Sequence, residues 1–387
     1  MSELEVLHQL QAAPELLQAI DDSASSELAT QQKLRRLYNT QLVQAALSLH
    51  EVRIRARGVL ENAHDLWLTA TGLEQATHPC VAAHKAARFP KNLRVLDLCG
   101  GIGCDAAALS GRGPVTVFDT DEAMLQRCEW NLSKWGCDVP ELRTDDALQV
   151  TLTGQIIHAD PDRRNGRSRP VKRLEMYNPN LAWMQEATRS AAGGAIKIGP
   201  ASNFIQKFPG CEIELISLRG ECREATVWFG EMADCEQFRA TVLPTGETIC
   251  GDPLDAWANI ANEPARYLFD PDPAVVRSGL IDGVCERLEL ERLDPEEEYL
   301  TADRLPESSF VTAFEVEAVL PNNQKQLRQY LRQSPGKYYE LKCRRIPMDA
   351  VAVSRKLPTG DGPVKVVFFL RVQGKTRVVI AKRITLE

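Results

Sequence analysis

Several features that mark particular protein classes are missing from this 387-residue sequence. It has no apolar run long enough to cross a bilayer and no signal-peptide pattern, so we expect a cytoplasmic protein with no membrane partner. The 11 cysteines form an odd count, lie far apart and include no CxxC pair. This distribution predicts reduced thiols in place of disulfides or a zinc site, and we expect no metal.

What remains is the composition of a globular protein, with 44% hydrophobic and 26% charged residues and a length that predicts two or three domains. The charge is unevenly distributed along the chain. Residues 311–387 hold 15 Lys and Arg against 6 Asp and Glu, a net charge of +9, whereas residues 1–310 hold 31 against 47, a net charge of -16. A basic module on an acidic body suits a nucleic-acid-binding appendage or, equally, a basic face that docks on the body.

The spacing of apolar residues divides the chain into four parts. Residues 1–90 have helical spacing and predict a helical N-terminal region. Residues 91–234 alternate short apolar runs with helical stretches, which predicts an α/β domain with a parallel sheet. Its last two runs, CEIELISLRG and EATVWFGEM, are too close for an intervening helix, so we expect an antiparallel hairpin to end the sheet. Residues 235–310 predict a connector of helices and loops, and residues 311–387 predict a small α+β domain.

The stretch VLDLCGGIGCDAAAL, residues 95–109, places a glycine-rich loop directly after the first predicted strand. In an open parallel sheet, ligands bind outside the carboxyl ends of the strands, and glycines let a ligand approach the backbone. Gly101, Gly103 and Ala106 also satisfy the G-x-G-x-x-A pattern of dinucleotide-binding proteins. A P-loop is excluded because no Gly-Lys-Ser/Thr follows. Asp97 disfavours a dinucleotide, since a carboxylate beside a pyrophosphate is electrostatically unfavourable.

With Asp97 at the strand end, this loop resembles that of the class I methyltransferases, whose cofactor carries no phosphate. The D-x-C-G-G-x-G pattern is formed by Asp97, Cys99, Gly101 and Gly103, and Cys99 stands where the family often has its first loop glycine. The resemblance extends over residues 75–232. It implies a Rossmann-like methyltransferase sheet, cofactor binding by these four residues, and S-adenosyl-L-methionine as the cofactor.

Further acidic residues lie where this resemblance requires them. Asp119 ends the second predicted strand, 16 residues after Gly103, where its carboxylate can accept both ribose hydroxyls. Asp121 is better interpreted as the N-cap of the next helix. Asp146 resembles the acid that contacts the adenine amino group, with Asp145 as the alternative. A lone Asp is more commonly a cap or a surface residue, but the order and strand-end positions of these acids favour the cofactor site.

After the fourth predicted strand, IIHADPDRRNGR resembles the short motif of amine-methylating family members, an Asp, Asn or Ser followed by prolines and often an aromatic residue. We expect Asp160 to accept a hydrogen bond from an exocyclic amine and to offset the positive charge that develops during transfer. Pro161 would hold the turn rigid. The aromatic residue that stacks on a flat base is missing, and Asp162 and Arg163 stand in its place.

Two arginines directly follow the aspartates of this motif. Arg163 and Arg164 can stack on a base and bridge a phosphate, which predicts substrate binding. The alternative is a salt bridge to the nearby acidic surface. We favour substrate contact because both arginines follow a strand end that faces the cofactor.

The outer segments resemble a bacterial group of methyltransferases with a C-terminal THUMP-like domain. The run LEQAT, residues 73–77, and the tail segment YYELKCRRIPMDAVAVSRKL carry this resemblance. THUMP domains deliver RNA to modification enzymes, so the resemblance implies RNA as a partner. In the tail, Lys342, Arg344 and Arg345 form the basic cluster that we expect to contact RNA phosphates.

Together these observations predict an S-adenosylmethionine-dependent methyltransferase that acts on an exocyclic amine of an RNA base. One alternative is a protein or small-molecule methyltransferase whose basic tail only packs on the body. Another is an RNA-binding protein that keeps the fold while its DPDRR motif no longer catalyses.

Overall fold

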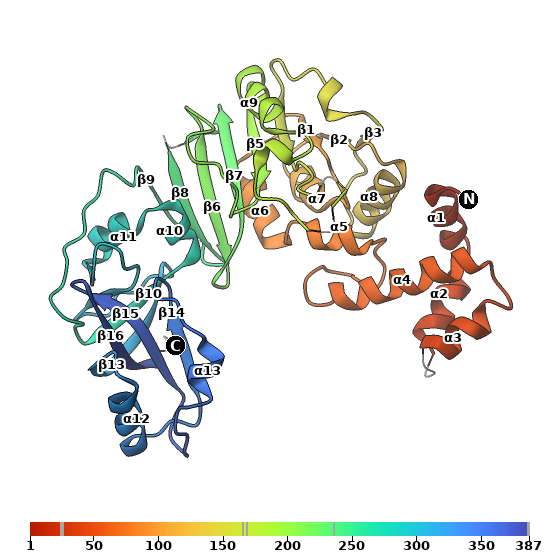
Figure 1. Cartoon of the computed structure of the whole chain (residues 1–387). Coiled ribbons are helices and arrows are strands. Elements are labelled where there is room, and N and C mark those ends of the chain that lie inside the picture. Colours follow the sequence, from red (N-terminus) through yellow and green to blue (C-terminus); the bar gives the residue numbers. More distant parts are fainter. Residues whose placement is uncertain (24–26, 165, 168, 235–236, 385–387) are drawn as a thin grey trace. The chain divides into compact units, whose positions relative to one another are not determined.

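The computed structural model describes residues 1–23, 27–164, 166–167, 169–234 and 237–384. The chain forms two compact units (Figure 1). The first contains Met1–Cys211 and Thr226–Asp234, and the second contains Glu212–Ala225 and Cys235–Glu387.

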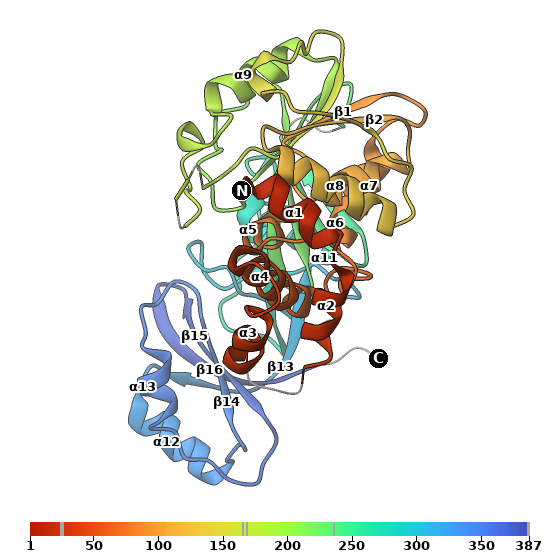
Figure 2. The same cartoon turned by 90° about the vertical axis from the view of Figure 1, so that its right-hand side faces the viewer.

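The first 90 residues are helical, as their apolar spacing predicts. The helices are α1 (Glu3–Gln11), α2 (Pro14–Asp21), α3 (Glu27–Leu34), α4 (Thr40–Ala56), α5 (Ala70–Gln75) and α6 (Pro79–Arg88). Helix α4 begins where the Asn39 side chain accepts a hydrogen bond from the Gln41 amide at 2.8 Å, and its Leu42, Ala46 and Leu49 face the core. Helix α1 packs against α8 (Glu122–Lys134) of the α/β domain (Figure 2).

A parallel sheet forms the centre of the first unit. Its strands are β1 (Val95–Leu98), β2 (Val115–Phe118), β3 (Glu141–Arg143), β4 (Ile156–Ala159) and β5 (Gly193–Ile198), in the order β3-β2-β1-β4-β5. Helices α7 (Cys104–Ser110) and α8 connect successive strands, and α9 (Leu181–Ser190) precedes β5. Two short 3-10 helices, η1 (Ala147–Gln149) and η2 (Leu174–Met176), lie in the loops around β4. Because β1, β2 and β4 are adjacent and parallel, their carboxyl ends meet at one edge of the sheet.

The expected antiparallel hairpin is present but does not end the sheet. Strands β6 (Glu212–Leu218) and β7 (Glu221–Gly230) are joined by Arg219 and Gly220, whose positive φ angles of 53° and 78° suit a two-residue hairpin turn. Strand β8 (Phe238–Leu243) then pairs parallel to β6, and β9 (Glu247–Gly251) pairs antiparallel to β8. The free edge of β6 is thereby covered, and the α/β fold with an antiparallel edge is confirmed.

The prediction that residues 235–310 form a connector of helices and loops is wrong. This segment supplies β8 and β9 to the first sheet and then forms β10 (Tyr267–Pro271), α10 (Pro273–Ser278), α11 (Ile281–Leu288), β11 (Glu291–Arg292) and β12 (Leu300–Ala302). Strand β10 pairs with β13 (Val311–Pro321), so β10, β11 and β12 belong to the same sheet as the tail. The short strands are hidden in the sequence because Pro, Asp and Glu residues interrupt their apolar runs.

The tail has the expected α+β composition. It contains β13, α12 (Gln324–Gln333), β14 (Tyr339–Cys343), α13 (Ala350–Ser354), β15 (Lys365–Val372) and β16 (Lys375–Arg383), within a sheet ordered β11-β12-β10-β13-β16-β15-β14. Alternate residues of β15 enter two cores. Phe368 packs with Tyr299 and Phe314, whereas Phe369 packs with Leu327 and Leu331 of α12. No helix among the described residues is long and apolar enough to span a membrane.

Candidate active site

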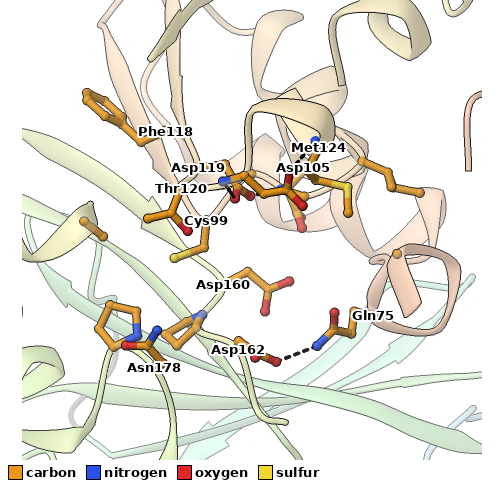
Figure 3. Close-up of a pocket in the computed structure, with 18 of the residues that line it drawn as sticks. Gln75, Cys99, Asp105, Phe118, Asp119, Thr120, Met124, Asp160, Asp162 and Asn178 are labelled. Carbon is orange, nitrogen blue, oxygen red and sulfur yellow. Dashed lines mark hydrogen bonds between the residues drawn. The ribbon is translucent and has the colours of Figure 1, made fainter. Parts of the chain in front are cut away.

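A pocket of about 320 Å³ opens at the sheet edge where the carboxyl ends of β1, β2 and β4 meet (Figure 3). The loop after β1 forms one wall, the residues after β2 another, and the residues after β4 a third. The predicted site residues that line it are Cys99, Gly101, Asp119, Asp146, Asp160, Pro161 and Arg163. Asp97, Gly103 and Arg164 are not among the lining residues.

The glycine-rich loop depends on left-handed backbone conformations. Cys99 has a φ of 65°, Gly101 of 55° and Gly103 of 93°. A Cβ at Gly103 would lie 2.8 Å from the Cys128 sulfur, so glycine is required there by both backbone and packing. A Cβ at Gly101, by contrast, would meet no protein atom within 4 Å, although Gly101 lines the pocket. The loop therefore leaves open space at the backbone of Gly101.

Asp119 is tied to this loop by its backbone contacts. One carboxylate oxygen accepts a hydrogen bond from the Gly101 amide at 3.1 Å, and the other accepts one from the Asp121 amide at 3.0 Å. Burial raises the pKa of the Asp119 carboxyl, while these two amides oppose the rise. Asp121 is the N-cap of α8, as predicted, because its carboxylate accepts hydrogen bonds from the Ala123 and Met124 amides.

Asp146 is the N-cap of η1 and also lines the pocket. One of its carboxylate oxygens accepts a hydrogen bond from the Leu148 amide at 2.9 Å. Its neighbour Asp145 lines the pocket as well and is exposed. Asp145 and Asp146, the two candidates for the adenine contact, therefore both line the pocket.

Asp97 lies beneath the pocket, where it contacts His158 of β4. It is 1% exposed, and its Oδ1 lies 2.7 Å from His158 Nδ1. The second carboxylate oxygen is buried and has no hydrogen-bond partner among the described atoms. Burial raises the pKa of Asp97, and the hydrogen bond from His158 partly offsets that rise. Its position differs from the direct cofactor contact that the resemblance implied.

His158 begins a buried chain of polar contacts that the sequence did not reveal. Lys85 Nζ lies 3.3 Å from His158 Nε2, and an ammonium can only donate, so His158 must carry its hydrogen on Nδ1 toward Asp97. The same ammonium lies 2.9 Å from Asp105 Oδ1. Thr77 donates to the other oxygen of Asp105 at 2.5 Å.

The chain reaches the pocket through Lys197 of β5. Its ammonium donates to Thr77 Oγ1 at 2.8 Å, to the Gln75 carbonyl at 3.0 Å and to Asp160 Oδ2 at 2.8 Å. The Asp160 side chain projects into the pocket (Figure 3). A continuous set of contacts thus links Asp97, under the glycine loop, to Asp160.

Two members of this buried chain leave a signal in the sequence. His158 interrupts the apolar run IIHAD and Lys197 interrupts GGAIKIG, and a polar or charged side chain in a fully buried strand needs a partner. Lys85 and Thr77 leave no comparable signal, because both belong to the segment before the sheet. Their role appears only once that segment is packed against β4 and β5.

The two arginines of the DPDRR motif have different surroundings. Arg163 lines the pocket, whereas Arg164 forms an ion pair with Glu74 at 2.5 Å, the alternative interpretation for that residue. Asp162 accepts hydrogen bonds from the Gln75 side chain at 2.7 Å and from the Arg164 amide at 2.8 Å. Asp162, which stands where the motif often has an aromatic residue, therefore stabilises the turn by these hydrogen bonds.

The tail cluster is engaged by carboxylates of the second unit. Lys342 lies 2.8 Å from Asp270, and Arg344 lies 2.8 Å from both Asp270 and Glu298. Arg345 also pairs with Glu298, although more than half of its side chain is exposed. These ion pairs support the interpretation that the basic face neutralises acidic residues of the rest of the chain.

Two comparisons with known proteins identify the family. Residues 311–383 match the THUMP domain-like family model. An uncharacterized S-adenosylmethionine-dependent methyltransferase of Mycobacterium tuberculosis H37Rv is 35% identical over 311 residues, 78% of this chain and 84% of the relative. The chain belongs to the S-adenosylmethionine-dependent methyltransferases. A methyltransferase candidate from Porphyromonas gingivalis W83 shares the fold, with a TM-score of 0.78 at 17% identity over 100% of both chains.

The methyltransferase pocket has a charge that suits its cofactor. Its described lining contains seven carboxylates and one cation, Arg163. The carboxylates belong to Asp105, Asp119, Asp121, Asp145, Asp146, Asp160 and Asp162. This excess of negative charge disfavours a pyrophosphate and favours a ligand with ammonium and sulfonium groups. The open backbone at Gly101 and the apolar walls of Ile102, Phe118 and Met124 complete a site that fits S-adenosylmethionine. No cluster of metal-ligating side chains occurs within the described part of the chain.

The buried chain predicts that Asp105→Asn destabilises the methyltransferase by ~3–5 kcal/mol at neutral pH, because Lys85 would lose its buried carboxylate. Burial alone opposes ionisation of Asp105, but Lys85, Lys197 and the Thr77 hydroxyl outweigh it and hold its pKa well below the usual value. A lowered pKa stabilises the fold above the unfolded-state pKa of about 4, and this contribution is lost as the pH falls below it. The stability difference between wild type and variant should therefore narrow in acid.

Urea denaturation followed by tryptophan fluorescence, at neutral pH and near pH 3, measures this difference. Asp145→Asn is the matched control, because Asp145 is exposed and should change stability little. A loss below about 1 kcal/mol at neutral pH, or a difference that widens in acid, contradicts the proposed role of Asp105.

Proposed function

We propose that this methyltransferase transfers a methyl group to an exocyclic amine of an RNA base. The observation that carries the proposal is the Asp160 carboxylate, which projects into the pocket from the end of β4 while Lys197 holds its other oxygen at 2.8 Å (Figure 3). A fixed carboxylate at this position can accept a hydrogen bond from an amine. The THUMP-like match over residues 311–383 supports RNA as the molecule that carries the amine.

The lining residues divide between cofactor and acceptor. The open backbone at Gly101 and the neighbouring Cys99 would accommodate the methionine part, Asp119 would accept the ribose hydroxyls, and Asp146 would contact the adenine amine. Gly103 would act indirectly by shaping the loop, and Asp97 would act from below through His158. When bound, S-adenosylmethionine supplies a methyl group activated by its sulfonium charge.

The protein's own contribution is alignment and electrostatics. Asp160 Oδ1 would accept a hydrogen bond from the amine, direct the nitrogen lone pair at the methyl group, and offset the positive charge that develops on nitrogen. The nitrogen would then release its extra proton to Asp160 or to solvent. Pro161 is buried and limits the motion of the turn. Arg163 stands at the same wall and would stack on or bond to the base. The Lys197 ion pair keeps Asp160 in one orientation.

A protein or small-molecule acceptor is the second candidate. The observation that favours it is the neutralisation of Lys342 and Arg344 by Asp270 and Glu298, which leaves fewer free cations in the tail. Arg345 has the most exposed side chain of this cluster. If the substrate is RNA, as we propose, we expect Arg345 to make the contact between this cluster and RNA.

We expect Asp119→Ala to weaken binding of S-adenosylhomocysteine by at least about a hundredfold, since it loses two charge-assisted hydrogen bonds to the ribose that contribute ~1.5–3 kcal/mol each. Asp119→Asn should lose less, because its amide oxygen still accepts one hydrogen bond. Calorimetric titration measures both variants after their melting temperatures show that they are folded. Wild-type affinity in Asp119→Ala would remove this residue from the cofactor site.

The experiment that tests the function incubates the enzyme with methyl-labelled S-adenosylmethionine and with total RNA, protein extract or a small-molecule extract in parallel. Label should enter RNA as a base methylated on an exocyclic nitrogen. Asp160→Ala should keep its affinity for S-adenosylhomocysteine and lose transfer by roughly a hundredfold, because the interaction acts mainly in the transition state. Label that enters only protein or small molecules would favour the second candidate and contradict RNA methylation.

A further inference from the structure

A strongly basic segment leaves the pocket directly after the catalytic motif. Residues 163–173, here called the basic loop, contain Arg163, Arg164, Arg167, Arg169, Lys172 and Arg173 and no acidic residue. Residues 1–310 as a whole hold 31 basic and 47 acidic side chains, so the basic loop reverses the charge of its surroundings. Residues 165 and 168 lie outside the described part of the chain.

The segment that contains the basic loop is fixed at the pocket by two flanking residues, Asp162 and Asn178. Asp162 donates its amide hydrogen to the Asn178 carbonyl at 2.7 Å, and Asn178 donates its own to the Asp162 carbonyl at 3.0 Å. Both residues line the pocket, and Figure 3 shows them at the same wall as Asp160. The basic loop therefore lies in an excursion of the chain that leaves the pocket wall at Asp162 and returns to it at Asn178.

Hydrogen bonds hold several of the described residues of the basic loop. The Val171 amide donates to the Arg163 carbonyl at 2.9 Å, and the Arg167 amide donates to the Arg164 carbonyl at 2.9 Å. The Asn203 amide donates to the Lys172 carbonyl at 3.1 Å, which fastens the returning half to the segment after β5. The cations are thus presented by an anchored backbone, which lowers the entropy lost when they bind a ligand.

Carboxylates of the protein neutralise only part of this charge. Arg164 pairs with Glu74, and Arg173 lies 3.6 Å from Glu175. Arg167, Arg169 and Lys172 are exposed, and the described residues give them no ion pair. The tail cluster differs, because Lys342 and Arg344 already have carboxylate partners.

The pocket itself repels phosphate. Its seven carboxylates would oppose a phosphodiester, whereas a neutral base can enter. The backbone on either side of an inserted base must then remain outside, beside the pocket wall. We propose that Arg167, Arg169 and Lys172 of the basic loop bind the phosphates of the RNA strand whose base enters the pocket. This inference rests on the proposed function and places an electrostatic RNA contact on the catalytic unit.

The test uses the full-length protein with Arg167, Arg169 and Lys172 all changed to Ala. A second variant with Lys33, Arg35 and Arg36 changed to Ala is the control, because it removes the same charge from exposed positions in the last turn of α3 and directly after it. Binding of a fluorescein-labelled single-stranded RNA of mixed sequence is measured by anisotropy over a series of KCl concentrations. Titration with S-adenosylhomocysteine and thermal melting check that each variant is folded.

We expect the basic-loop variant to bind RNA more weakly and its slope of log affinity against log salt to flatten by about 2, since each phosphate contact on a single strand contributes about 0.7. The control should keep the wild-type slope. A folded basic-loop variant with the wild-type slope overturns the inference and leaves RNA methylation standing. Wild-type protein without salt-dependent RNA binding overturns both.

Discussion

The organisation of the first unit depends on a buried chain of charged groups between β1, β4 and β5. Two ammonium groups, Lys85 and Lys197, and three carboxyl groups, Asp97, Asp105 and Asp160, are linked through His158 and Thr77. Removing such charges from water is costly, so each group has to be placed against a partner. This requirement explains why the segment before the sheet is part of the catalytic unit, because Thr77 and Lys85 come from it.

This buried chain also connects the two halves of the pocket. Asp97 sits under the glycine loop, on the cofactor side, and Asp160 projects into the pocket, on the side that we assign to the acceptor. The acidic lining suits a cationic cofactor, and the basic loop at its wall suits the phosphates that the lining would repel. The change from negative to positive charge takes place within five residues of the sequence, from Asp160 and Asp162 to Arg163 and Arg164.

The features that can be predicted from the sequence are local ones. Short apolar runs predict where strands end, so the sequence alone places Asp119 and Asp160 at the sheet edge. The spacing of the glycines after the first strand predicts the cofactor loop. The buried chain could not be predicted, because Lys85 and Lys197 are far apart in the sequence and meet only through packing. The partners of the tail cluster could not be predicted either, since Asp270 and Glu298 lie in the segment whose pattern indicates a connector. Prolines and acidic residues there break up strands too short to show periodicity.

If Lys197 positions Asp160 for methyl transfer, its loss should slow the reaction, and single-turnover transfer of labelled methyl to RNA by Lys197→Met tests this most directly. Lys197→Arg serves as the charge-conserving comparison. We expect the transfer rate of Lys197→Met to fall by at least ~10-fold, equivalent to about 1.4 kcal/mol in the barrier, while its affinity for S-adenosylhomocysteine stays at the wild-type value. A folded Lys197→Met that binds the cofactor product normally and transfers at the wild-type rate would contradict this role of Lys197.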